Sequence, residues 1–221
     1  MLSARLAALA ARIRPGSRLV DVGTDHAYLP IYAVQQNICP FAIATDIRSG
    51  PVACAREHIA AVGLAEHIDV RKGDGLASVK PEEAEDIVIA GMGGELIAAI
   101  LEAAPFVRAP RIRLLLQPMS RPEKLREYLL THGFSLEWED VVCEGERLYI
   151  VMQASFANAA PITDTAAYYI GALPPEHTRY WQQLCDRLEQ KAKGLLTGGA
   201  EKEARETGAL LKTLRAYWQE G

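Results

Sequence analysis

Two aspartates and a histidine flank a single glycine near the start of the chain, in the run Asp21-Val22-Gly23-Thr24-Asp25-His26. The run follows the apolar residues Leu19 and Val20 and precedes a helix-like segment that continues to residue 36. A glycine at the end of a buried strand permits a sharp turn and lets a ligand approach the backbone, while the next helix presents free N–H groups to that ligand. The pattern predicts the first strand-to-helix crossing of a nucleotide-binding α/β sheet.

The charge of this turn indicates which kind of nucleotide it binds. The dinucleotide fingerprint G-x-G-x-x-G is incomplete, because Asp25 and Tyr28 stand at the second and third glycine positions. A carboxylate repels a pyrophosphate and attracts a cation. S-adenosylmethionine (SAM) carries a sulfonium and an amino group and no phosphate, so the turn favours SAM as the cofactor. An NAD-dependent oxidoreductase is the least favoured class.

Three further strand-like segments end in residues suited to the same ligand. Residues 41–46 end in Asp46, which follows Asp21 by 25 residues, near the spacing at which an acid binds a ribose diol. Residues 68–71 lead into Gly73-Asp74-Gly75, where Asp74 could accept a hydrogen bond from an adenine amine. A helix N-cap for Asp46 and an ordinary turn for Asp74 are the structural alternatives.

The third segment, residues 86–90, is fully apolar after its first residue and leads into Gly91-Met92-Gly93-Gly94. Glycines permit positive φ angles and close backbone approach, so three of them in four residues predict a ligand-facing loop.

The rest of the chain supplies the elements that position these turns. Residues 1–13 have the apolar spacing of an amphipathic helix, and helices are expected at 51–62 and 124–132. A strand at 112–117 precedes an antiparallel hairpin at 134–142 and 148–156. The predicted fold is α/β, with a Rossmann-like sheet that ends in an antiparallel β-hairpin. This arrangement is typical of SAM-dependent methyltransferases.

The composition changes near residue 158, where we expect a domain boundary. Residues 157–178 contain three prolines and predict an irregular connection. Beyond it, apolar residues step by three and four in two segments joined by Thr197-Gly198-Gly199, which predicts a coiled-coil-like antiparallel helical hairpin. Residues 1–158 would bind the cofactor. Residues 159–221 would hold RNA or serve as a packing element, with aromatic residues in the hairpin core.

Cysteine content and charge narrow the function classes. The cysteines Cys39, Cys54, Cys143 and Cys185 are scattered without a C-x-x-C pair, which predicts buried thiols in a cytoplasmic protein, with no metal site and no disulfides. No apolar run reaches the roughly 18 residues of a membrane span. The net charge is −4, yet residues 1–18 and 108–126 are locally basic. These stretches either hold RNA phosphates or form solvated surfaces.

Four motifs resemble, in order and spacing, the TrmK family of bacterial tRNA (adenine-N1)-methyltransferases. They are DVGTDHAYLP at 21–30, GDGL at 73–76, IAGMGG at 89–94 and LQP at 116–118. The leading helix and the C-terminal hairpin match too, so the resemblance covers nearly the whole chain. It implies SAM as methyl donor and tRNA as partner, with adenine 22 of the D-arm as acceptor. We expect a monomer or weak dimer with no membrane partner.

The resemblance also implies roles for residues at the matched motifs. Asp25 and His26 would be catalytic. The cofactor would contact Asp21, Gly23, Asp46, Ile47, Gly73, Asp74, Gly75, Ala90, Gly91 and Met92. The substrate would contact Tyr28, Gly93, Gly94, Gln117, Pro118, Arg5, Arg12 and Arg121. Two positions depart from the family pattern, since Asp46 replaces a glutamate and Met119 replaces an asparagine.

Two other functions are compatible with the sequence. A SAM-dependent methyltransferase that acts on a protein or a small molecule would suit the acidic net charge. A non-catalytic RNA-binding protein with a degenerate Rossmann domain would use the C-terminal hairpin. The acids at the ends of the first three strands and the intact AGMGG motif argue against a degenerate site.

Overall fold

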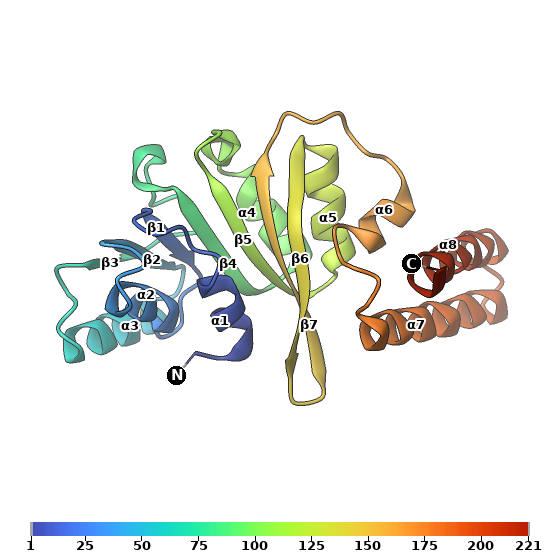
Figure 1. The fold of residues 1–221 in the computed structure, drawn as a ribbon, viewed down its shortest axis with the longest axis horizontal. Coiled ribbons are helices and arrows are strands. Elements are labelled where there is room, and N and C mark those ends of the chain that lie inside the picture. Colours follow the sequence, from blue (N-terminus) through green and yellow to red (C-terminus); the bar gives the residue numbers. More distant parts are fainter. Residues whose placement is uncertain (1, 221) are drawn as a thin grey trace.

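Within residues 2–220, which a computed structural model describes, seven strands form one mixed sheet (Figure 1). They are β1 (Leu19–Val22), β2 (Ala42–Asp46), β3 (Ile68–Lys72), β4 (Asp86–Gly93), β5 (Arg113–Ser120), β6 (Phe134–Glu144) and β7 (Arg147–Phe156). Their order across the sheet is β3-β2-β1-β4-β5-β7-β6. Strands β1 to β5 are parallel, and β7 pairs antiparallel with both β5 and β6. The predicted Rossmann-like sheet with a terminal antiparallel hairpin is confirmed.

Helices follow most of the strands. They are α1 (Ala4–Ala10), α2 (Tyr28–Gln35), α3 (Ser49–Ala61), α4 (Gly94–Glu102), α5 (Pro122–Thr131), α6 (Thr165–Ile170), α7 (Thr178–Thr197) and α8 (Glu201–Glu220), with short 3-10 helices η1 (Pro81–Glu83) and η2 (Pro105–Arg108). None of the helices described has the length and apolar character that crossing a membrane requires.

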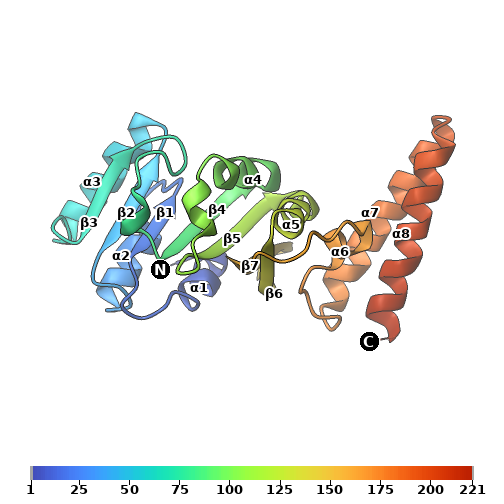
Figure 2. The ribbon, with the colours of Figure 1, turned by 90° about the horizontal axis from the view of Figure 1, so that it is seen from above.

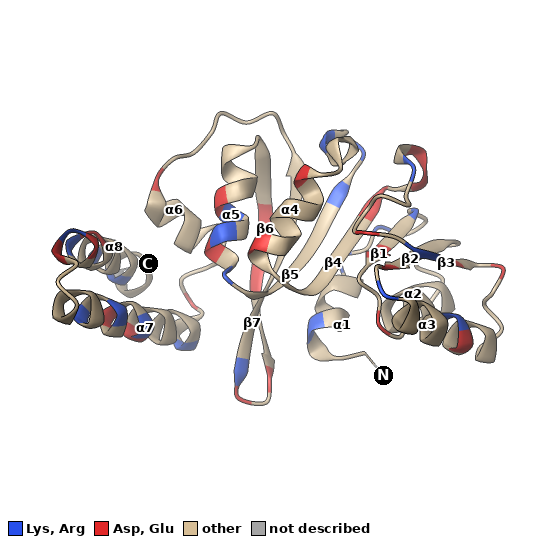
Figure 3. Cartoon of the chain, turned by 180° about the vertical axis from the view of Figure 1, so that it is seen from behind, with Lys and Arg blue, Asp and Glu red and all other residues tan. Residues whose placement is uncertain are grey.

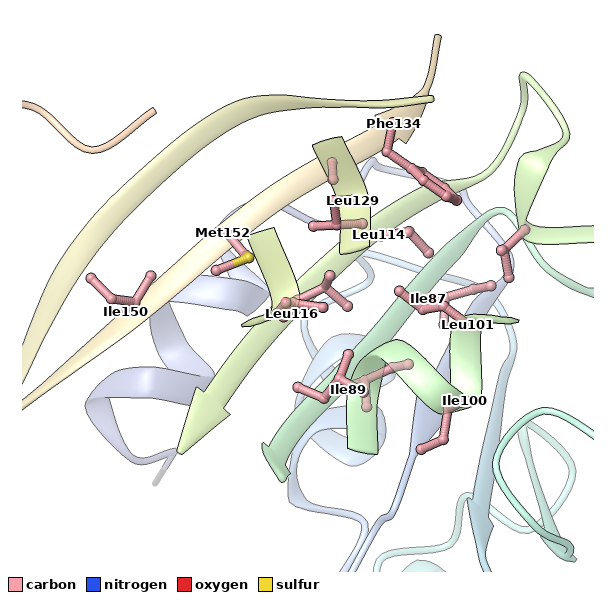
Figure 4. Close-up of a cluster of buried hydrophobic side chains, with 14 of the residues drawn as sticks. Ile87, Ile89, Ile100, Leu101, Leu114, Leu116, Leu129, Phe134, Ile150 and Met152 are labelled. Carbon is pink, nitrogen blue, oxygen red and sulfur yellow. The ribbon is translucent and has the colours of Figure 1, made fainter. Parts of the chain in front are cut away.

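Both faces of the parallel strands are covered. Successive side chains of a strand point to opposite faces. In β4, Ile87 and Ile89 therefore join the cluster under α4 and α5 (Figure 4), whereas Val88 joins a second cluster under α1, α2 and α3. Figure 2 shows α1 on one side of the sheet and α4 and α5 on the other. Because both faces are buried, the strand ends are where this sheet can present polar groups to a ligand.

Two predicted segments differ from the structure. The N-terminal helix spans Ala4–Ala10 rather than residues 1–13, and Met1 lies outside the described residues. The connection over 157–178 is not irregular throughout, because α6 forms within it. The side chain of Asp164 caps α6 by accepting a hydrogen bond from the backbone N–H of Ala166 at 3.0 Å. A helix of 6 residues is too short to show a periodic apolar pattern.

Helices α7 and α8 form the expected helical hairpin, which lies beyond the β6–β7 end of the sheet (Figure 2). Tyr180 and Trp181 are in the core, as predicted, and Tyr217 and Trp218 are partly buried against it. Trp181 is fully buried, and its Nε1 donates to the carbonyl oxygen of Pro174 at 3.0 Å. The hydroxyl of Tyr217 donates to the carbonyl oxygen of Leu173 at 2.8 Å. These bonds satisfy polar atoms that burial would otherwise leave without partners.

A buried ion pair joins the sheet to the C-terminal segment. Arg126 of α5 donates through Nε to Glu139 of β6 at 2.8 Å, and both side chains are almost completely buried. Arg126 also donates to the carbonyl oxygen of Tyr169 at 2.8 Å, and Glu139 accepts from the backbone N–H of Ala172 at 2.6 Å. Four segments of the chain therefore meet at one pair of opposite charges.

We expect Glu139→Gln to lower the free energy of unfolding by about 3–5 kcal/mol, because the Arg126 charge then stays buried without its counter-ion. Urea unfolding followed by circular dichroism measures this loss. Lys124→Gln is the control on the same helix. It breaks an exposed pair with Glu127 and should cost less than about 1 kcal/mol. Equal losses for the two variants would contradict the structural role of the buried pair.

Candidate active site at the carboxyl edge of the sheet

A cavity of about 460 Å³ opens where β1 and β4 end and α1 and α2 begin. It gathers eight of the residues that the sequence predicted for the site: Arg5, Asp21, Gly23, Asp25, His26, Tyr28, Ala90 and Gly91. Strand order reverses between β1 and β4, so their carboxyl ends leave a crevice, as in other doubly wound sheets. The fold thus brings residues from distant parts of the sequence to one place.

Gly23 makes this crevice possible. Its φ angle is +78°, and a Cβ atom at this position would clash with the Cε of Met92. Any other residue would strain the turn and displace the Met92 side chain. Met92, which the sequence analysis assigned to the cofactor, also packs against the core on the α4–α5 face.

The sequence predicted a ligand-facing loop after residue 90. The segment instead continues β4 to Gly93, although Gly91 lines the cavity. Met92 pairs with Pro118 and Gly93 with Ser120, and the register shifts between Ala90 and Met92. Gly91 lies at this bulge with a φ of +80° and with open space around its Cα. Gly94 is the buried first residue of α4, where a Cβ would clash with the carbonyl oxygen of Arg121. Packing and backbone conformation therefore account for part of this glycine pattern.

The buried amide of Gln117 holds the bulge in place. Its Oε1 accepts from the backbone N–H of Gly91 at 3.2 Å and from Arg5 at 2.9 Å, and its Nε2 donates to the carbonyl oxygen of Pro118 at 2.9 Å. Arg5 in turn donates to Glu144 at the tip of the hairpin, at 2.9 Å through Nε and 2.9 Å through its backbone N–H. The sequence analysis assigned Gln117 and Arg5 to the substrate, whereas the structure gives both polar partners within the protein.

Asp21 is a buried carboxylate at the back of the cavity. Burial raises its pKa from 3.8 to about 6, and a hydrogen bond from Thr24 offsets part of that rise. Within residues 2–220, no lysine, arginine or histidine pairs with it. A buried carboxylate without a cation is costly, and a cationic ligand would relieve that cost.

Arg48, which follows β2, lines this cavity, whereas the predicted cofactor residues Asp46, Ile47 and Gly73 do not. Asp46 is buried, and its Oδ1 accepts from the backbone N–H of Arg48 at 2.7 Å. The backbone N–H of Gly73 donates to the carbonyl oxygen of Asp46 at 3.0 Å, which joins the two strand ends. Ile47 is exposed. Asp74 and Gly75, although predicted for the same site, line a separate cavity beside α4.

Asp25 and His26 stand at the rim. Asp25 is largely exposed, and its Oδ2 lies 3.2 Å from Nε2 of His26. The His26 ring stacks on Tyr28 with 5.2 Å between ring centroids, and the Tyr28 side chain is half exposed. An anionic group beside an exposed aromatic surface suits a planar base that carries positive charge.

The structure also assembles a cluster that the sequence analysis missed. His26, Cys54 and His58 place three metal-ligating atoms within 4.8 Å of one another. The sequence signal was present, because Cys54 and His58 are four residues apart and share one face of α3. The prediction of uniformly buried thiols holds for Cys39 and Cys185, but Cys54 is half-buried and Cys143 is exposed.

Most of the predicted basic surface is neutralised by carboxylates, and acidic and basic segments lie close together in Figure 3. Arg14 and Arg113 both contact the fully buried Asp86, the latter at 3.0 Å. Arg126 is buried against Glu139. The expectation that all of 1–18 and 108–126 bind phosphates is therefore wrong for these three arginines, because their charges stabilise the fold.

Two other predicted substrate residues also have protein partners. Arg121 pairs with Glu95 at 2.6 Å on the surface. The Arg12 guanidinium lies 3.8 Å from the centre of the Trp138 ring, a cation–π contact.

A second opening, the junction groove, separates the β5–α5 turn from α7. It has a volume of about 410 Å³ and is lined by Pro118, Met119, Arg121, Tyr169, Arg187 and Lys191, among others. Arg187 and Lys191 are exposed on α7, and among the side chains described for residues 2–219 no carboxylate forms an ion pair with either. Both cations lie beside the edge of the sheet at which the cavity around Asp21 and Gly91 opens.

Comparisons with known proteins agree with this geometry. A family model for a methyltransferase domain matches residues 2–152. The tRNA (adenine(22)-N(1))-methyltransferase of Bacillus subtilis is 40% identical over 172 residues, which are 78% of this chain and 72% of that protein. The crystal structure of B. subtilis TrmK, an M1A22 tRNA methyltransferase, has a TM-score of 0.87 at 33% identity and covers 97% of this chain and 98% of that one.

A Streptococcus pneumoniae protein, Sp1610, solved in complex with S-adenosyl-L-methionine, has a TM-score of 0.83 at 30% identity. The alignment covers 99% of this chain and 100% of that one. The structural matches therefore extend over both the sheet and the C-terminal helices. The chain belongs to the TrmK family of Rossmann-like methyltransferases.

Proposed function

We propose that this chain transfers the methyl group of SAM to N1 of an adenine in tRNA, at position 22 as in the named relative. The observation that carries the proposal is the buried Asp21, which has no cationic partner among the described residues and faces a cavity bordered by open glycine backbone. A tRNA substrate also accords with the predicted cytoplasmic location. The four cysteines agree with that location, because none of them forms a disulfide.

The carboxylates at the strand ends fit SAM. Asp21 would hold the amino group of the cofactor, and Asp46 at the end of β2 would hold the ribose diol. Gly23 and Gly91 both line the cavity, and the space around the Cα of Gly91 is open. When bound, SAM supplies a methyl group on a positively charged sulfur. No phosphate-binding glycine pattern is needed for such a ligand, which explains why Asp25 can occupy the second position of the fingerprint.

Adenine N1 already carries a lone pair, so the protein has no proton to remove before methyl transfer. Its main task is to align the base and to exclude water. The methylated adenine is cationic, and Asp25 would stabilise the charge that develops on it. A stacked or paired adenine cannot enter the cavity, so the base must be flipped out of its helix. Tyr28, exposed at the rim, offers a ring on which the flipped base could stack.

The junction groove would hold the tRNA backbone. Arg187 and Lys191 are free cations on α7, and the groove begins at Pro118 and Met119 beside the strand ends. This assignment moves most of the phosphate-binding role from the predicted basic stretches, residues 1–18 and 108–126, to the C-terminal hairpin. The division into residues 1–158 and 159–221 remains a prediction, and of the two roles predicted for the second unit, RNA holding or packing, the groove favours RNA holding.

We expect the full chain to convert adenine to 1-methyladenine in unmodified tRNA, as measured with labelled SAM and nucleoside analysis. Asp25→Asn should lower kcat by about 100-fold and leave the Kd for SAM unchanged, because the carboxylate acts on charge that develops in the transition state. Full activity of Asp25→Asn would refute the electrostatic role. Label that enters protein and not tRNA would refute the proposed substrate.

Asp21→Asn should raise the Kd for SAM by about 10–100-fold, which corresponds to the free energy of one hydrogen bond to a charged group. Isothermal titration calorimetry measures this loss. Asp186→Asn, which removes an exposed carboxylate on α7, should leave SAM binding unchanged. Unchanged affinity in Asp21→Asn would show that Asp21 does not hold the cofactor.

The same substitution should change how stability depends on pH. Because the folded-state pKa of Asp21 is raised from 3.8 to about 6, protonation favours the folded state. This stability is fully present below pH 3.8 and is lost as the pH rises through about 6. Without ligand, Asp21→Asn should therefore raise the free energy of unfolding by about 2–3 kcal/mol at pH 7.5 and leave it almost unchanged at pH 4. An equal change in the free energy of unfolding at both pH values would contradict the raised pKa of Asp21.

The double variant Arg187→Glu, Lys191→Glu should weaken tRNA binding at least about tenfold and reduce its salt dependence, because about one phosphate contact is lost per cation. Filter binding at several salt concentrations measures both effects. Lys193→Glu is the matched control on the same helix, since Lys193 already pairs with Glu189 at 3.0 Å and does not line the groove. If Lys193→Glu weakens binding as much as the double variant, the junction groove is not the tRNA site.

A further inference from the structure

Three side chains at the rim of the cofactor cavity bring metal-ligating atoms within 4.8 Å of one another. His26 precedes α2, whereas Cys54 and His58 lie one turn apart on α3. Nδ1 of His26 lies 3.0 Å from Sγ of Cys54, and Nε2 of His58 lies 3.9 Å from the same sulfur. All three residues are half-buried, so the cluster is accessible from solvent.

The hydrogen bonds around the two imidazoles determine where their lone pairs point. Nδ1 of His58 lies 3.2 Å from the carbonyl oxygen of His26, which can only accept, so this nitrogen carries the hydrogen. Nε2 of His26 lies 3.2 Å from the carboxylate of Asp25, so that nitrogen carries its hydrogen. The remaining nitrogens, Nδ1 of His26 and Nε2 of His58, therefore both present lone pairs to Cys54.

One thiol hydrogen satisfies only one of these two lone pairs. A divalent cation satisfies both and also binds the thiolate. Histidines that bind metals usually donate their other N–H to a carboxylate or a backbone carbonyl, and both kinds of support are present here. We propose that His26, Cys54 and His58 form a zinc site that links the loop before α2 to α3.

The distances fit this proposal. In a tetrahedral zinc site the Zn–S distance is about 2.3 Å and the Zn–N distance about 2.0–2.1 Å, which places nitrogen and sulfur ligands about 3.5 Å apart. The two nitrogen–sulfur distances, 3.0 and 3.9 Å, lie on either side of that value. Two imidazoles and one thiolate are ligands that zinc prefers, and the exposed side of the cluster leaves a fourth position for water.

A metal at this position would act on the site without being part of the methyl-transfer chemistry. Coordination through Nδ1 keeps the His26 ring oriented, with its Nε2–H on Asp25 and its face on Tyr28. The rim residues would then be held against α3 in one arrangement. This inference goes beyond the proposed function, and its test needs neither SAM nor tRNA.

The full chain, freed of metal with a chelator, should bind one Zn²⁺ per molecule in a titration. Titration with Co²⁺ alone should produce a thiolate-to-cobalt charge-transfer band and the d–d bands of a four-coordinate ion. Cys54→Ser should abolish the charge-transfer band, and His58→Gln should weaken binding by more than tenfold. Cys143→Ser and His67→Gln are the matched controls, because they remove an exposed cysteine and a histidine outside the cluster and should bind like the parent.

A further variant tests whether the carboxylate that supports His26 contributes to metal binding. Asp25→Asn should lower the affinity for Zn²⁺ by about 10–100-fold, because Asp25 orients His26 without touching the metal. Circular dichroism of each variant checks that it is folded. The proposal is overturned if the parent chain gives no charge-transfer band, if Cys54→Ser keeps the band, or if Cys143→Ser loses it.

Discussion

Burial of the parallel strands on both faces is the constraint on which the rest of this structure depends. Carboxylates can therefore be placed only near the strand ends of the parallel sheet. Two buried aspartates at opposite ends of their strands have different roles. Asp86, at the amino end of β4, is contacted by Arg14, Arg113 and Ser17 and stabilises the fold. Asp21, near the carboxyl end of β1, has no such cations among the described residues. The same residue type is structural at one edge and available to a ligand at the other.

The cavity beside Asp21 is supported from a distance. Glu144 at the tip of the β6–β7 hairpin holds Arg5 of α1, Arg5 holds the amide of Gln117, and that amide holds the backbone of Gly91. Each step is a hydrogen bond between partly or fully buried groups, so its loss would leave a polar atom without a partner. The antiparallel hairpin that closes the sheet thus contributes to the position of the bulge in β4 at the cofactor site.

In the proposed function, two separate regions of the molecule bind the cofactor and the RNA. Carboxylates and glycines at the β1–β4 crevice suit a cationic cofactor, whereas free cations on α7 suit a polyanion. The Arg126–Glu139 pair joins these regions, because it connects α5 and β6 to the segment that leads into α7. Under the proposed function, a base flipped from RNA in the junction groove would have to reach Asp25 and Tyr28, which line the other cavity.

The sequence by itself determined the strands, the acids at their ends and the glycine at the first turn, because these depend on local pattern and on backbone conformation. Its motifs also identified the family. Only the tertiary structure decided which charges are free, since Arg14, Arg113 and Arg126 find their carboxylates on other elements. It likewise decided that Gly91 to Gly93 continue a strand, because the pairing partner is β5, and that His26 meets Cys54 and His58. Contacts between residues far apart in the chain have no local signal, and here they separate the residues that build the fold from those left for ligands.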